Sequence, residues 1–240
     1  MAFKIAFVGL DHVHVNQMAH SFIHSGEDYE FLGAADFLSE DKDEIDRKFH
    51  NNTAPNIRET LTLFYELDEL LSLGPDLVVV NSDVKSHADC VCMLLERDFN
   101  VLVEKPMAFD FEDAKRMYRA AKKSSGELII NWPIAWFPAF NKAKELADSG
   151  TVGEVLRVQY RSPSTRGPYR LDQFTPRQLS EMWWYKSDRG GGSIFDYAGY
   201  GCVLTTWITG KNAKRVSGIK KNFFLPFSDV EDYSCFTIDF

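Results

Sequence analysis

The first half of the chain alternates between short apolar runs and segments with helical spacing. Five apolar runs have the length of buried strands and lie at residues 4–9, 29–36, 76–81, 100–103 and 128–131. Helical segments separate them, at about 12–24, 67–71, 88–95 and 111–123. Strands that alternate with helices predict right-handed βαβ units. We therefore expect a doubly wound parallel sheet of the α/β class over residues 1–131.

The pattern changes after Trp132. Helices are predicted at about 138–149 and from the glycine run to about Thr209, and strands at 155–160, 215–224 and 233–240. These elements predict a second, α+β domain over residues 132–240. The last strand pattern stops abruptly at Phe240, so we expect this domain to be truncated at its C-terminus, with an exposed sheet edge.

Composition places the chain among ordinary globular proteins. It has 240 residues, of which 45% are hydrophobic and 26% charged, enough to bury a core without disulfides. The net charge of −8 argues against general binding to nucleic acid or to an anionic membrane. We find no signal peptide, no apolar stretch of the roughly 18 residues that span a bilayer, and no disulfide framework among the four cysteines. These features predict a cytoplasmic protein.

The turn after the first predicted strand resembles a dinucleotide-binding loop in which most of the glycines are missing. The fingerprint is G-x-G-x-x-G, but here only Gly9 remains, with Asp11 and His14 at the other glycine positions. Asp36, at the end of the second strand, is placed to accept hydrogen bonds from ribose hydroxyls and to repel a 2′-phosphate, which favours NAD over NADP. A solvated acid at a strand end is the alternative interpretation of Asp36.

The same loop raises the possibility of a metal site. His12 and His14, with Asp11, resemble the first ligands of a barrel amidohydrolase, and imidazole is a good zinc ligand. Such a site needs histidines from later strands, whereas all six histidines here lie at or before position 87. We therefore expect no metal and keep the metal-dependent hydrolase as a minor alternative.

A second candidate site follows the strand at 100–103. Lys105 comes at the carboxyl end of that strand, where doubly wound sheets bind ligands. Glu104 can hold the lysine in place, and Pro106 stiffens the turn. A structural ion pair is the alternative.

These motifs together resemble the Gfo/Idh/MocA family, which is named after glucose–fructose oxidoreductase and inositol dehydrogenase. Residues 101–106 resemble its strand ending in Glu-Lys-Pro, and residues 190–200 resemble its Gly-Gly-Gly-x3-Asp-x3-His/Tyr segment. Weaker likenesses lie at 81–87, where the proline of the family's motif is missing, and at 137–155.

The resemblance implies an N-terminal Rossmann domain, a C-terminal domain with an open, mostly antiparallel sheet, and a homo-oligomer formed through that sheet. It implies an NAD(H)-dependent dehydrogenase acting on CH–OH groups of a sugar, polyol or sugar derivative. Cofactor contacts would come from two strand-end loops and their neighbours, namely Gly9, Leu10, Asp11, His12, Val13, His14, Asp36, Asn81, Ser82, His87, Glu104 and Lys105.

The resemblance also assigns the chemistry to Lys105, Asp196 and Tyr200. Asp196 and Tyr200 are four residues apart, on one helix face. A free phenol has a pKa near 10, and a nearby ammonium would lower it, so Lys105 can help Tyr200 act as a base. Ordinary packing aromatics are the alternative.

Substrate recognition is expected between about Arg161 and Arg189. Trp184 and Arg189 offer an aromatic face and a cation for a sugar, although the tryptophan is equally compatible with a core position. The main alternative function is a catalytically silent relative, because Asp11 and His14 weaken the dinucleotide loop.

Overall fold

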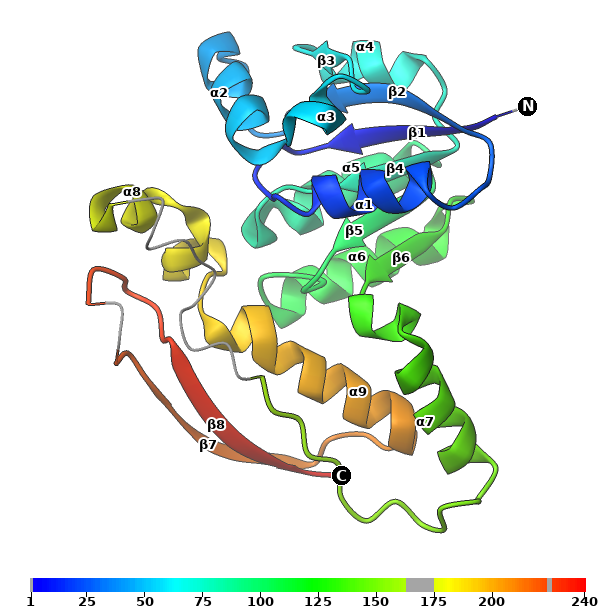
Figure 1. Cartoon of the computed structure of the whole chain (residues 1–240), viewed down its shortest axis with the longest axis vertical. Coiled ribbons are helices and arrows are strands. Elements are labelled where there is room, and N and C mark those ends of the chain that lie inside the picture. Colours follow the sequence, from blue (N-terminus) through cyan, green and yellow to red (C-terminus); the bar gives the residue numbers. More distant parts are fainter. Residues whose placement is uncertain (1, 163–174, 224–225) are drawn as a thin grey trace. The chain divides into compact units, whose positions relative to one another are not determined.

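The computed structural model describes residues 2–162, 175–223 and 226–240 (Figure 1). The chain divides into two compact units, Met1–Asn131 and Trp132–Phe240. In the part of the chain that is described, no helix has the length and apolarity that crossing a membrane requires.

The first unit is built on a six-stranded, fully parallel sheet with the strand order β3-β2-β1-β4-β5-β6. Its strands are β1 (Phe3–Val8), β2 (Tyr29–Ala35), β3 (Leu63–Phe64), β4 (Leu77–Val80), β5 (Val101–Glu104) and β6 (Leu128–Asn131). This order is that of the dinucleotide-binding doubly wound sheet, whose direction of winding reverses between β1 and β4. The predicted fold class is confirmed.

Helices cover both faces of this sheet (Figure 1). They are α1 (Val15–Ile23), α2 (Lys42–Asn52), α3 (Pro55–Arg58), α4 (Leu67–Ser72), α5 (His87–Glu96) with its preceding 3-10 turn η1 (Val84–Ser86), and α6 (Phe111–Lys123). Alternate residues of β1 enter two separate cores: Ile5 and Phe7 pack with α1, α2 and α3, whereas Ala6 and Val8 pack with α4, α5 and α6. A strand buried on both faces, as most of β1 is, forms a continuous apolar run in the sequence, which explains why the sequence predicted it.

Two features of this unit differ from the expectation. The helix predicted from residue 12 begins at Val15, because residues 12–14 form the turn that leaves β1. The elements α2, α3 and β3 were not predicted. Asp41 caps α2 by accepting hydrogen bonds from the backbone N–H groups of Asp43 and Glu44.

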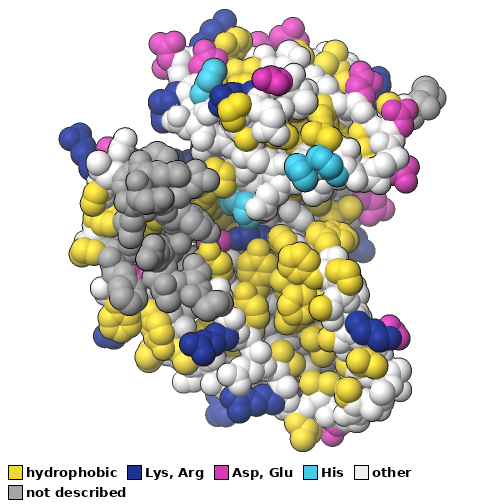
Figure 2. Space-filling model, in the orientation of Figure 1, with side chains coloured by type: hydrophobic (Ala, Val, Ile, Leu, Met, Phe, Trp, Pro, Cys, Tyr) yellow, Lys and Arg dark blue, Asp and Glu magenta, His cyan; other side chains and the backbone are white. Residues whose placement is uncertain are grey.

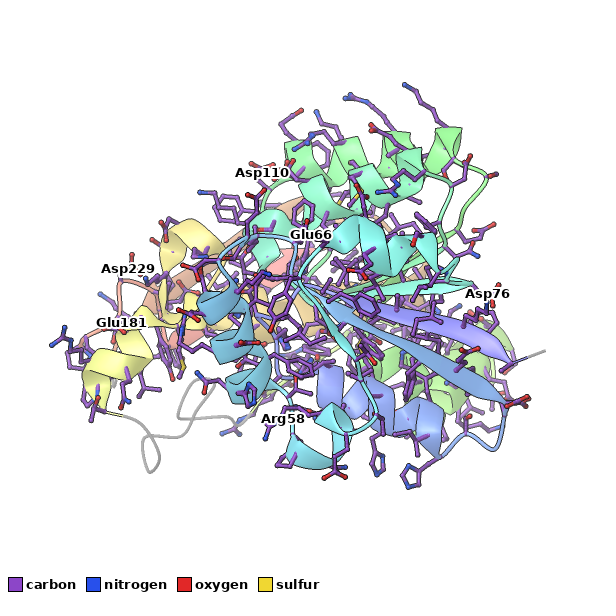
Figure 3. All side chains as sticks on the ribbon, turned by 90° about the horizontal axis from the view of Figure 1, so that it is seen from above. Arg58, Glu66, Asp76, Asp110, Glu181 and Asp229 are labelled. Atoms are coloured by element: carbon purple, nitrogen blue, oxygen red, sulfur yellow. The ribbon has the colours of Figure 1, made fainter. Side chains whose placement is uncertain are left out.

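Different loops lie at the two ends of the strands, which form an amino-terminal and a carboxyl-terminal edge of the sheet. At the amino-terminal edge, Asp76 precedes β4 (Figure 3) and its Oδ2 accepts a hydrogen bond of 2.9 Å from the backbone N–H of Lys4. The loops with the candidate residues lie at the carboxyl-terminal edge, after β1, β2, β4 and β5.

The second unit combines helices with an antiparallel pair of strands. It contains η2 (Pro133–Trp136), α7 (Pro138–Asp148), α8 (Pro176–Glu181), η3 (Trp183–Tyr185), η4 (Ser187–Arg189), the π-helix η5 (Ile194–Ala198), α9 (Gly199–Thr209), β7 (Arg215–Lys221) and β8 (Tyr233–Asp239). This arrangement confirms an α+β unit with an antiparallel sheet.

The prediction of a strand at residues 155–160 is wrong. The segment forms no ladder with a neighbouring strand, and a cavity of about 1090 Å³ is lined both by it and by β8. Alternating apolar residues make a strand only where another backbone supplies hydrogen bonds. The loop expected to select substrate lies partly outside the described residues, as does Phe224 at the end of another predicted strand.

Candidate functional site

Gly9 fixes the turn at the end of β1. Its φ is +84°, and a Cβ at this position would lie 2.4 Å from the backbone nitrogen of Ser82. Its own N–H donates to Ala35 at the end of β2, at 2.9 Å. Only glycine combines this backbone conformation with such a close approach. The turn therefore brings together the ends of β1, β2 and β4, at the point where a doubly wound sheet binds its ligand.

The backbone beyond Gly9 leads into α1. The N–H of His12 donates to the carbonyl of Asn81 at 3.0 Å, and the N–H of His14 donates to the Nδ1 of His12 at 3.1 Å. No side chain caps α1. A helix N-terminus at this place favours an anion through its N–H groups and its dipole.

A buried ion cluster lies under this turn. The ammonium of Lys48, from α2, is 2.8 Å from the Oδ2 of Asp36 and 3.2 Å from the Oδ1 of Asp11. The side chains of Lys48, Asp36 and Asp11 are 10%, 0% and 7% exposed. The other oxygen of Asp36, Oδ1, accepts the N–H of Leu10 at 3.3 Å. Asp36 thus lies where the sequence predicted, but Lys48 covers it.

Sequence reasoning missed Lys48. The signal was available, because Lys48 lies between Ile45 and Phe49 on the inward face of α2, and both neighbours are core residues. A charged residue on an apolar helix face must find a buried partner.

Burial controls the ionisation of this cluster. Desolvation raises the pKa of Asp11 to about 6; Lys48 opposes this shift, and the carboxylates of Asp36 and Asp83 add to it. Burial lowers the pKa of Lys48, but the two carboxylates beside it more than offset that effect and leave it above its ordinary value. The ammonium of Lys48 therefore stays charged at neutral pH, whereas the carboxyl group of Asp11, with a pKa of about 6, loses its proton close to neutral pH.

Glu104 connects three strand-end segments. Its carboxylate is fully buried, and Oε2 accepts hydrogen bonds from the Nδ1 of His14 at 3.1 Å and from the backbone N–H of Lys105 at 3.2 Å. Oε1 accepts from the side-chain amide of Asn131, at the end of β6, at 2.8 Å. Lys105 is 3% exposed. The glutamate thus holds Lys105 through its backbone, as part of a network that includes the loop after β1.

The two histidines of the loop belong to this network. Ligand atoms of His12, His14 and Glu104 lie within 4.8 Å of one another, so the group that could hold a metal ion includes Glu104 in place of Asp11. Burial, then His14, Lys105 and His87, keep the pKa of His12 well below its ordinary value. Because the Nδ1 of His12 accepts a backbone N–H and the Nδ1 of His14 faces a carboxylate, hydrogen bonds already use one nitrogen of each ring.

Asn81 supplies an observation about the cofactor. It is fully buried directly after β4, and among the described residues neither amide atom of its side chain has a hydrogen-bond partner. An unsatisfied buried amide costs about 1–3 kcal/mol, which a bound polar ligand can offset. Asn81 directly follows β4, whose end meets the Gly9 turn, so this amide fits a polar ligand such as a dinucleotide at the point where the winding of the sheet reverses.

His87 lies between the loop after β4 and the turn after β5. It is 1% exposed, and its Nδ1 and Nε2 lie 3.0 Å from the carbonyl of Pro106 and 3.2 Å from the carbonyl of Ser82. Burial lowers its pKa. A backbone carbonyl lies next to each ring nitrogen, so the one nitrogen that carries a proton in the neutral ring can donate either to Pro106, after β5, or to Ser82, after β4. His87 thus packs between the two loops that follow β4 and β5.

Asp196 and Tyr200 belong to the second unit. Asp196 lies in η5, where its N–H donates to the carbonyl of Gly192 at 3.0 Å, and Tyr200 is the second residue of α9. The Tyr200 ring meets the edge of Trp132 at a centroid distance of 5.3 Å and stacks on Tyr160 at 6.4 Å. Residue 196 therefore lies in a π-turn, a kind of irregularity that is frequent at functional sites.

The glycine run before η5 is tightly packed. A Cβ on Gly191 would lie 2.2 Å from the carbonyl oxygen of Trp184, and Gly192 has a φ of +107°. The glycines thus allow the chain to cross the backbone of Trp184. The side chain of Trp184 is half-buried against the Leu179–Tyr185 core, which favours the packing interpretation.

Arg189 ends the short turn η4. Asp229 holds the start of that turn by accepting hydrogen bonds of 2.9 Å from the backbone N–H and the hydroxyl of Ser187, and it lies in this unit with Glu181 (Figure 3).

Apolar side chains gather on the visible face of the unit, over the region where Figure 1 draws α7 and α9 (Figure 2). Trp136 and Phe137, just before α7, are 61% and 53% exposed. Such a surface is typical of a ligand or partner site.

Two curated relatives illustrate what the chain resembles. It is 34% identical over 134 residues to the 1-carboxy-3-chloro-3,4-dihydroxycyclo hexa-1,5-diene dehydrogenase of Comamonas testosteroni. It is 31% identical over 91 residues to the myo-inositol 2-dehydrogenase of Thermotoga maritima. These alignments cover 55% and 37% of this chain, and 32% and 27% of the relatives. The matched part of the chain thus spans about a third or less of the length of these two relatives.

A solved structure shows the same fold. The WlbA dehydrogenase of Chromobacterium violaceum, crystallised with NADH and UDP-GlcNAcA, superimposes with a TM-score of 0.73 at 17% identity. The match covers 99% of this chain and 63% of the other.

Family models match both units. Residues 3–131 match the oxidoreductase family with an NAD-binding Rossmann fold, and residues 140–240 match the C-terminal domain of the same family. The two matches occur in family order and cover most of the chain. The chain therefore belongs to the Gfo/Idh/MocA family of oxidoreductases, and its first unit is the family's NAD-binding Rossmann domain.

Proposed function

We propose that the protein is an NAD(H)-dependent oxidoreductase that transfers a hydride between nicotinamide and a hydroxyl-bearing carbon of a sugar, polyol or sugar derivative. The observation that carries the proposal is the family match of both units. The names of the relatives, a dihydroxy-ring dehydrogenase and an inositol dehydrogenase, support the substrate class. The free cysteines and the NAD requirement suit the cytoplasm.

The first unit would hold the cofactor through the loop 9–14 and through Asn81 and Ser82. Bound NAD supplies the hydride acceptor. The protein must manage the hydroxyl proton, and we assign its removal to Tyr200. Lys105 would stabilise the developing alkoxide, and Asp196 would orient a substrate hydroxyl.

Cofactor binding is the first test. We expect NADH to stabilise the protein saturably in a thermal-shift titration and to change its nicotinamide fluorescence on binding. No response at millimolar NADH would overturn the proposal. A screen of sugars and inositols for NAD reduction then identifies the substrate class.

Turnover tests the catalytic residues. With the substrate found, Lys105→Ala and Tyr200→Phe should each reduce turnover by at least about 100-fold. Variants that bind NADH normally and keep near wild-type rates would remove these two assignments.

One observation favours a second candidate, a catalytically silent relative. Asp11 and His14 occupy two glycine positions of the dinucleotide loop, and Asp11 brings a buried carboxylate to it. Saturable binding of sugars or inositols without any NAD reduction would favour this candidate.

A further inference from the structure

We propose that Lys48 is a specificity-determining residue of the cofactor site, because its ammonium sets the charge that the phosphate groups of NAD or NADP meet. This inference rests on the proposed function and deepens it. Nothing in the sequence motifs assigns Lys48, which comes from α2, outside the glycine loop.

The position of the ammonium carries the argument. Lys48 contacts Asp11 in the turn after β1, where a doubly wound fold places the pyrophosphate, and Asp36 at the end of β2, where it places the adenosine ribose. One buried cation would therefore lie next to both phosphate-bearing parts of a bound NADP.

The charge balance shows what the cation does. The carboxylates of Asp11 and Asp36 are nearly fully buried, and that of the half-exposed Glu44 lies 3.9 Å from the ammonium. Without Lys48, no buried cation would balance Asp11 and Asp36, and the negative charge that the pair retains would lie next to the phosphates, in surroundings where water screens little. Lys48 thus makes the site tolerant of phosphate.

The effect must differ between the two cofactors. NADP carries an additional 2′-phosphate on the ribose, beside Asp36, and this carboxylate alone repels it. The ammonium 2.8 Å from Asp36 is the cation that offsets this repulsion. Removing it should therefore weaken NADPH binding much more than NADH binding.

The experiment compares dissociation constants for NADH and NADPH, measured by nicotinamide fluorescence on the whole chain. In Lys48→Met, we expect both dissociation constants to rise. The ratio of the dissociation constant for NADPH to that for NADH should rise by at least about tenfold. Lys48→Arg keeps the charge and should keep the ratio within about threefold of wild type. The double variant Lys48→Met with Asp36→Asn removes one charge of each sign, so its ratio should return toward wild type.

Lys42→Met is the matched control, because Lys42 lies on the same helix with an exposed side chain and the variant loses the same charge. It should leave both constants unchanged. If Lys48→Met behaves like Lys42→Met while wild type binds NADH, this inference is wrong and the proposed function stands. Binding of neither dinucleotide by wild type overturns both. Should Lys48→Met fail to fold, Lys48→Gln takes its place, because it removes the charge but keeps a polar group next to Asp36: a ratio of the two dissociation constants that stays at the wild-type value contradicts the inference.

Discussion

Asp11 is the residue where the energetics of the site can be tested without a substrate. Its folded pKa of about 6 lies above the ordinary value of 3.8. The neutral carboxyl therefore stabilises the fold fully below about pH 4, and this contribution is lost as the pH rises through 6. The two values differ by about 2 units, which corresponds to about 3 kcal/mol.

Asp11→Asn should thus gain free energy of unfolding relative to wild type as the pH rises. We expect the difference, variant minus wild type, to increase by about 2–3 kcal/mol between pH 4 and pH 7.5, measured by urea unfolding. Asp28→Asn, at an exposed position, serves as control. An unchanged difference across this range would show that the Asp11 carboxyl is not held in a desolvated site.

At the scale of single residues, the sequence predicted which polar residues and glycines lie at the ends of strands. Gly9, Asp36 and Glu104 are examples, because each comes directly after or at the end of an apolar run. It did not predict Lys48, whose partners are far away in the sequence and meet it only when α2 packs under the turn. It also assigned His87 a cofactor contact, which stays a prediction; in the structure each ring nitrogen lies next to a backbone carbonyl.

The turn from β1 to α1 is the element on which cofactor binding depends. Gly9 and Gly26 have nearly the same backbone conformation, with φ values of +84° and +81°. A Cβ on Gly9 would collide with the backbone of Ser82, whereas a Cβ on Gly26 would meet nothing within 4 Å. Two alanine substitutions therefore separate backbone strain from steric collision.

Gly9→Ala should destabilise the protein by at least about 2 kcal/mol more than Gly26→Ala, which carries only the cost of about 1 kcal/mol for a left-handed conformation. Gly9→Ala should also lose NADH binding, measured by thermal shift and fluorescence, while Gly26→Ala keeps it. Equal effects of the two substitutions would mean that the turn can move away from Ser82.

Strands were predictable where the sequence has an apolar run of strand length, and the clearest cases, β1, β4 and β5, are mostly buried. The parallel strands appear as continuous apolar runs, and α6 has its predicted bounds of 111–123. The alternation of apolar and polar residues at 155–160 led to a wrong prediction. Such alternation indicates one buried and one solvent-facing side, but it does not supply the partner strand that a ladder needs. The short β3, with two residues, is too small to leave a pattern.

The second unit, taken by itself, displays an unusual sheet. All seven residues of β7 are exposed, and among the described strands β7 pairs only with β8. Two strands alone are marginally stable, and an antiparallel sheet normally covers one face. Ile219, which is 62% exposed, pairs with Cys235, so these two residues share the face opposite Phe236 and Ile238.

We expect a second copy of the chain to cover this face, in line with the oligomer that the family resemblance implies. Wild type should then show at least a dimer mass by light scattering after size exclusion, and Ile219→Glu should shift it toward the monomer, because a charge buried without a partner is costly. Leu156→Glu is the control, since Leu156 is 87% exposed in the same unit but outside the sheet. If both variants keep the wild-type mass, or if wild type is a monomer at micromolar concentration, β7 and β8 do not form the interface.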